Sequence, residues 1–117
     1  MKTAHTDSNQ QTKHTPGPWA AKHAEYADAD AFEIRANDGA RIAEVSISQV
    51  LFRQKAAANA RLIASAPELL AALEWAHAIM HGYVYSETTE ERNHYMADLI
   101  HATENTAKAI AHAKGQA

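Results

Sequence analysis

Histidine is the residue type in this sequence with the clearest capacity for chemistry, because the chain has eight histidines and no cysteine. His77 and His81 are four residues apart, as on one helical face, and His94, Asp98 and His101 share a face in the same way. If the two helices packed antiparallel, nitrogen and oxygen ligands of the kind that zinc binds would converge. Such spacings are also common on solvated helical faces, and no HExxH motif is present. The metal hypothesis is therefore the weaker interpretation, and we expect no cofactor.

A second group of residues has the chemistry to bind a small ligand such as a nucleotide. Trp19 offers an aromatic face for stacking, while Arg35, Arg41 and Arg61 offer guanidinium groups that grip phosphate. Arg35 and Arg41 are out of phase with the apolar residues of the same segment, so they also fit the solvated face of a sheet. Arg61 could equally pair with Glu68. The structural interpretation of these four residues is favoured over a binding site.

Other catalytic signatures are missing from the sequence. It contains no glycine-rich phosphate loop and no nucleophile elbow. Glu87, Glu90 and Glu91 suit the start of a helix, where acidic groups complement the helix dipole. We therefore expect a protein that is not an enzyme.

One apolar cluster outside the helical pattern is a candidate interface. Tyr83, Val84 and Tyr85 follow the expected end of a helix. If exposed, they would form a contact surface, because aromatic residues are favoured at interface centres. If buried, they would fill the space between helices.

The elements that position these residues are predicted to form an α+β fold. Period-two alternation over 31–47 predicts a β-hairpin, and its Asn37-Asp38-Gly39 step supplies the positive φ angles of a tight turn. A possible third strand covers 19–26. Helical spacing follows over about 54–65, 66–81 and 88–113. We expect the three helices to cover the apolar side of the sheet.

Local signals set the expected helix boundaries. Ser65 with Glu68 and Thr88 with Glu91 have the spacing of capping boxes. Pro67 suits a first helical turn, and Gly82 predicts a helix end.

Length and charge limit the possible functions. At 117 residues we expect one domain over 16–117, preceded by a flexible arm over 1–15. The net charge of −3 makes nucleic acid an unlikely partner. No apolar run approaches the length of a membrane span and no signal peptide is evident, so we expect a cytoplasmic location. Much of the 46% hydrophobic content is alanine, which predicts a thin core with room for a partner or a second copy.

Two motifs carry a family resemblance. HTPGPW over 14–19 and NARLIASAPELLAAL over 59–73 together make the chain resemble a group of small, mostly uncharacterised bacteriophage and prophage proteins. The resemblance covers roughly 15–73. It implies expression inside a bacterial host cell and supplies no catalytic residues.

Three functional hypotheses follow. The first is a phage-encoded binding protein without enzymatic activity, which inhibits or modulates a host protein, with a defence protein as the expected target. The second is an oligomeric protein that sequesters a small ligand or nucleotide. The third is a metal-dependent protein that uses the histidines.

Overall fold

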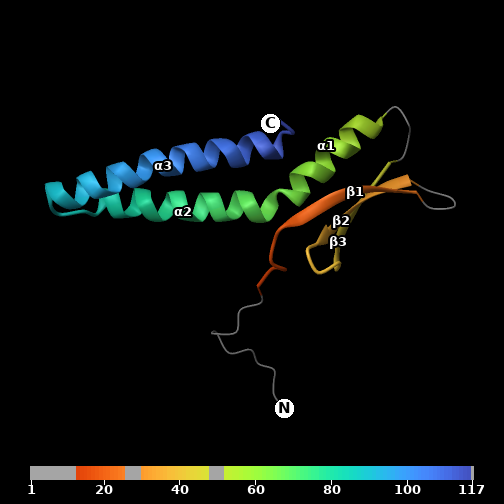
Figure 1. Cartoon of the computed structure of the whole chain (residues 1–117), viewed down its shortest axis with the longest axis horizontal. Coiled ribbons are helices and arrows are strands. Elements are labelled where there is room, and N and C mark those ends of the chain that lie inside the picture. The colour runs from red at the N-terminus through yellow and green to blue at the C-terminus, as the bar shows by residue number, and fades with distance from the viewer. Residues whose placement is uncertain (1–12, 26–29, 48–51, 117) are drawn as a thin grey trace, which may run out of the picture.

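The computed structural model describes residues 13–25, 30–47 and 52–116. An antiparallel sheet of three strands in the order β1-β2-β3 is followed by three helices (Figure 1). The predicted α+β fold is therefore confirmed, including the third strand. Most of the expected N-terminal arm lies outside the described residues. The elements are β1 (Trp19–Glu25), β2 (Asp30–Ala36), β3 (Arg41–Ser46), α1 (Arg53–Ala64), α2 (Ala66–Val84) and α3 (Thr89–Ala113).

The turn between β2 and β3 lies where the sequence predicts it, but its geometry differs. Within this turn, Asp38 has a negative φ and Gly39 a positive one, at +91°, so the expectation of positive angles from the whole Asp-Gly step was wrong. The Gly39 amide donates to the Ala36 carbonyl at 2.9 Å, and the Ala40 amide donates to Asp38 Oδ1 at 3.0 Å. The Asp38 side chain thus stabilises the turn directly, and only the glycine adopts the left-handed conformation.

In the described part of the chain, α1 is the helix that packs against all three strands. Ile34 of β2 is fully buried, and Ala56 and Ala60 are the buried residues of α1. The expectation that three helices cover the sheet was wrong. Helices α2 and α3 instead pack mainly on each other and project from the sheet as an antiparallel hairpin (Figure 1).

The seam of this helical hairpin is made of small side chains. Ala76, Ile79 and Ala102 form its buried cluster, against which Tyr95 and Leu99 pack. Among the described residues, the buried apolar side chains are nine alanines and two isoleucines, which agrees with the thin core expected from composition. Because alanines fill the seam, larger side chains occupy its flanks.

The junction between α1 and α2 differs from the predicted capping box. Ser65 has helical backbone angles, and its hydroxyl donates to the Arg61 carbonyl at 2.9 Å. Its side chain therefore points back along α1 and cannot cap α2. The predicted box at the start of α3 is confirmed: Glu91 donates its amide to Thr88 Oγ1, and its carboxylate accepts from the Thr88 amide, both at 3.1 Å.

The predicted helix end at Gly82 was wrong, because α2 continues to Val84. A Cβ atom at Gly82 would lie 2.4 Å from the Tyr95 ring of α3. This glycine gives an aromatic ring room to pack against the helix backbone, and it does not terminate the helix. No helix in the described part of the chain is both long enough and apolar enough to cross a membrane.

Candidate interaction surfaces

The turn between α2 and α3 exposes an aliphatic and an aromatic side chain together. Val84 is 70% exposed and Tyr85 is 71% exposed. Tyr83 is half-buried. The sequence left open whether this cluster was exposed or buried, and the structure divides it between the two. We call Val84 and Tyr85 the hairpin tip.

The backbone holds the hairpin tip firmly. The Tyr85 amide donates to the His81 carbonyl at 3.1 Å, and the two rings lie 4.7 Å apart. The Ser86 hydroxyl donates to the Tyr83 carbonyl at 2.7 Å. The tip is therefore an ordered helix end that is presented to solvent.

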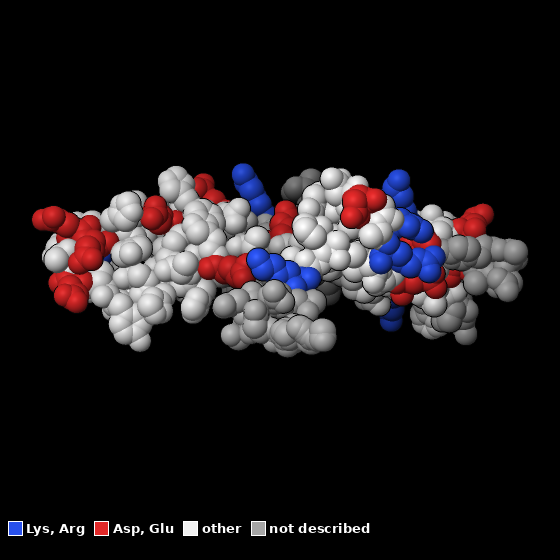
Figure 2. Space-filling model, turned by 90° about the horizontal axis from the view of Figure 1, so that it is seen from below, with Lys and Arg blue, Asp and Glu red and all other residues white. Residues whose placement is uncertain are grey.

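Acidic groups lie next to the hairpin tip. Glu87 follows it in the chain, and Glu90 and Glu91 are in the first turn of α3. Figure 2 shows acidic side chains gathered at this end of the molecule. One carboxylate oxygen of Glu91 is committed to the capping box, while Glu87 and Glu90 are exposed. A partner that binds this end would meet an apolar contact beside negative charge.

A second exposed surface runs along one side of the hairpin. Leu69, Leu73 and Ile110 line one groove of about 240 Å³, and Leu62, Leu69 and Ile110 line the adjoining one. Helical spacing places further apolar residues of α2 and α3 on the same side. We define this apolar face as Leu62, Leu69, Leu73, Met80, Met96, Leu99, Ile100 and Ile110.

The other side of the hairpin carries ionisable groups together with Trp75, which follows Glu68 by two helical turns and is 42% exposed. His112 of α3 lies 2.7 Å from the Glu68 carboxylate of α2 across this side. His94, Asp98 and His101 have the helical spacing of the same side. The hairpin therefore has two chemically different sides.

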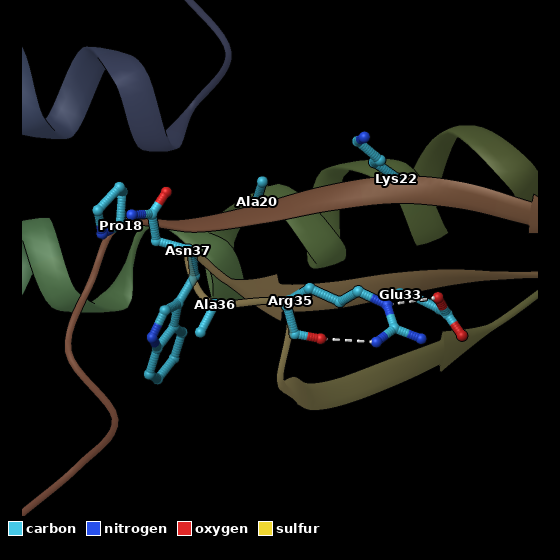
Figure 3. Close-up of a pocket in the computed structure, with 9 residues that line it drawn as sticks. Pro18, Ala20, Lys22, Glu33, Arg35, Ala36 and Asn37 are labelled. Carbon is cyan, nitrogen blue, oxygen red and sulfur yellow. Dashed lines mark hydrogen bonds and ion pairs between the residues drawn. The ribbon is translucent and has the colours of Figure 1, made fainter.

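The proposed nucleotide-binding residues are only partly brought together. Trp19 and Arg35 line one hollow of about 330 Å³ on the sheet, with Lys22 and Glu33 (Figure 3). Arg35 donates to Glu33 Oε1 at 3.0 Å and to the Gly39 carbonyl at 2.8 Å.

The other two arginines of that set do not line this hollow. Arg41 bonds the second Glu33 oxygen, so one carboxylate pairs with both guanidinium groups, and Arg41 also lies 3.6 Å from Glu44. Arg61 does not line this hollow, but it lines a second hollow of about 380 Å³ together with Trp19. Its guanidinium lies 3.4 Å from the Lys114 carbonyl. The side chain of Glu33 is only 13% exposed, which indicates a pairing within the sheet surface.

The histidines singled out by spacing do not converge. The rings of His77 and His81 are neighbours along α2, tilted by 44° with centroids 6.2 Å apart. On α3, His94 Nε2 lies 3.6 Å from the Asp98 carboxylate. In the described ranges, these residues and His101 form no group of three ligands within reach of one ion.

A different set of potential ligands, which sequence reasoning missed, does converge. His23, Glu25 and Asp30 have ligand atoms within 4.8 Å of one another, because β1 pairs with β2 and places Glu25 opposite Asp30. Recognising this set requires the strand register as well as the existence of the third strand.

The hydrogen bonding of His23 does not suit a metal. Arg53 lies 3.0 Å from His23 Nδ1, and guanidinium can only donate, so Nδ1 accepts and the proton sits on Nε2. Nε2 is the buried ring atom without a partner, and it lies 3.9 Å from Asp30. A metal would need the lone pair that this tautomer lacks, beside a fixed positive charge. We interpret the cluster as structural.

The fold and these surfaces define a small α+β protein with a projecting helical hairpin and exposed apolar contact surfaces. The chain belongs to a bacteriophage protein family: the family described as Salmonella phage P22 protein Y8K6 matches residues 1–117. The phage origin implied by the sequence motifs is therefore confirmed. Comparisons with curated proteins and with solved structures each found no match.

Proposed function

We propose that this phage protein is a binding protein without enzymatic activity, which modulates a host protein through direct contact at the hairpin tip. The class of target that we propose is a host defence protein. The observation that carries the proposal is the joint exposure of Val84 and Tyr85 at the end of a rigid helical hairpin.

The physical support comes from what the hairpin tip can contribute on binding. Tyrosine is enriched among the residues that dominate binding energy, because it buries a large area with few rotamers to fix. Val84 adds aliphatic area at the same point. Since His81 and the backbone already hold Tyr85, little ordering entropy remains to be lost on association.

The acidic residues beside the hairpin tip favour a target with a basic surface. Glu87 and Glu90 are exposed and near enough to the tip in sequence to lie at the rim of a contact. Charges at a rim chiefly raise the association rate and are screened by salt. The proposal therefore includes salt-sensitive association.

The test uses the full chain as bait in lysate of the bacterial host. We expect one or more host proteins to be captured by the unaltered chain and lost with the double variant Val84→Ser and Tyr85→Ser. The control is Leu70→Ser, which replaces an exposed leucine of the same helix away from the tip. Equal capture by the tip variant, or no enriched protein at all, would contradict the proposal.

A second arm tests the role of charge with the captured protein in purified form. Glu87→Gln with Glu90→Gln removes two charges and leaves the capping carboxylate of Glu91 in place. We expect slower association at low salt and a weaker dependence of the rate on salt. Unchanged association kinetics would show that the charges of Glu87 and Glu90 do not contribute to association with the target.

Small-ligand binding is the second candidate, favoured by the hollow that Trp19 and Arg35 share. Its volume of about 330 Å³ is at the lower end of the range for ligand sites. Arg35 would have to exchange its bonds to Glu33 and Gly39 for bonds to a phosphate. Thermal unfolding with a panel of nucleotides tests this, because a ligand that binds only the folded state raises the melting temperature.

A further inference from the structure

We infer that the chain forms a symmetric homodimer in which the apolar faces of two α2–α3 hairpins pack together as a four-helix bundle. The inference concerns a surface other than the hairpin tip and does not depend on any host target. It rests on the exposure, the spacing and the composition of the apolar face.

The exposed area of the apolar face is at the upper limit for the surface of a monomer. Six of its side chains are between 44% and 63% exposed. Together they present roughly 600 Å² of apolar area, at the upper limit of the largest patch on a typical monomer. The half-buried Leu69 and Leu99 add to this, which brings the face near the ~800 Å² that each partner buries in a standard interface. The six side chains are Leu62, Leu73, Met80, Met96, Ile100 and Ile110.

The spacing of the apolar face is that of a helical bundle. Leu69, Leu73 and Met80 are separated by four and seven residues on α2. Met96 and Ile110 are two heptads apart on α3, with Thr103 midway between them. Each helix therefore carries a second seam of period 3.5 beside the alanine seam that it uses within the hairpin. Helices with two adjacent seams are the units of four-helix bundles.

The composition of the face favours a second copy over a different protein. On α3 this stripe carries no charged side chain between Arg92 and Lys114, and on α2 the polar side chain between Leu73 and Met80 is His77. The α3 half of the face therefore lacks polar groups that would select a particular foreign partner. Two copies offer the same apolar spacing to each other, so the contact is self-complementary about a twofold axis.

A dimer also explains how a chain with so small a core could remain folded. In the part of the chain that the structure describes, alanine provides most of the fully buried apolar side chains. Each alanine buries little area, whereas each leucine, isoleucine or methionine of the apolar face would remove a larger exposed apolar area from water on association. Dimerisation would thus supply large side chains to the hydrophobic core.

The test measures the native mass of the full chain by light scattering or native mass spectrometry over a range of concentrations. We expect twice the chain mass of 12.8 kDa. Leu73→Glu should weaken the dimer by roughly 100-fold or more, because the contact would bury an unpaired charge. Leu73 is 63% exposed within one chain, so glutamate would remain solvated in the folded monomer.

The matched control is Ala78→Glu, which introduces the same charge on the same helix. Ala78 is exposed and lies five residues after Leu73, on the opposite side of α2. This variant should remain dimeric. A monomeric unaltered chain at high micromolar concentration, or a Leu73→Glu variant that stays dimeric, would overturn the inference.

A second measurement keeps the inference testable if Leu73→Glu fails to fold. The chain contains no cysteine, so Leu73→Cys and Ala78→Cys each introduce a single thiol. We expect the thiol at position 73 to react more slowly as the protein concentration rises, while the thiol at position 78 reacts at a constant rate. Reaction rates at position 73 that do not depend on concentration would also refute the dimer.

Discussion

Replacing Gly82 with alanine sets two effects of known size against each other. Alanine is favoured over glycine within a helix by about 1 kcal/mol. The new Cβ atom, however, would lie 2.4 Å from two atoms of the Tyr95 ring and 2.9 Å from a third. Overpacking of this kind costs about 1–3 kcal/mol, because the ring has to shift from the position in which it packs. We expect a net loss of about 1 kcal/mol in the free energy of unfolding.

A double-mutant cycle separates the two effects. With Tyr95→Ala in place, the overlap is gone and only the helix preference of alanine remains. Gly82→Ala should then stabilise that variant by up to about 1 kcal/mol, so the sign of its effect reverses. The assay is urea denaturation followed by far-ultraviolet circular dichroism, with all four proteins at one concentration so that any oligomerisation contributes alike. A stabilising Gly82→Ala in the presence of Tyr95 would refute the claim that the ring requires this glycine.

Two further substitutions test local features of the fold. Gly39→Ala should lower the free energy of unfolding by about 1 kcal/mol, entirely through the φ of +91°, because no atom lies within 4 Å of the added Cβ. Gly39→Asn should lower it by less, since asparagine tolerates a positive φ better. Equal losses for the two variants would contradict a backbone origin. Thr88→Ala should destabilise the fold by about 1 kcal/mol by removing the acceptor of the Glu91 amide. Thr88→Ser should restore most of that stability in a thermal melt, and no recovery would show that the hydroxyl is not the stabilising group.

Local patterns in the sequence predict most of the elements but not their arrangement. Alternation and the turn at Gly39 predict the hairpin, and helical spacing with the capping box at Thr88 predicts α3. Gly82 and Ser65 were misinterpreted because the determinants of their conformation lie outside the local sequence. The Tyr95 ring is part of α3, and Ser65 is both the residue after the end of α1 and the residue before the start of α2.

The candidate surfaces were harder to predict for the same physical reason. An apolar stripe on a helix has the same pattern whether it faces its own sheet or the solvent. Leu73 and Ile110 could therefore be recognised as an apolar pattern, while their exposure follows from the alanine seam that lets α2 and α3 pair with each other. Val84 and Tyr85 were identified as interface candidates from composition, but their exposure depends on α2 extending past Gly82.

The backbone at Ser65 joins α1 to α2, so it affects the direction of α2 and the position of the hairpin tip. Its amide bonds to the carbonyls of Arg61 and Leu62, and its own carbonyl accepts from Leu69, so one residue joins the ladders of two helices. The 19 residues of α2 extend about 28 Å beyond it, and a rotation of about 10° at this joint would displace the far end by about 5 Å. The position of Tyr85 in space therefore depends on the backbone at Ser65, at the opposite end of the same helix.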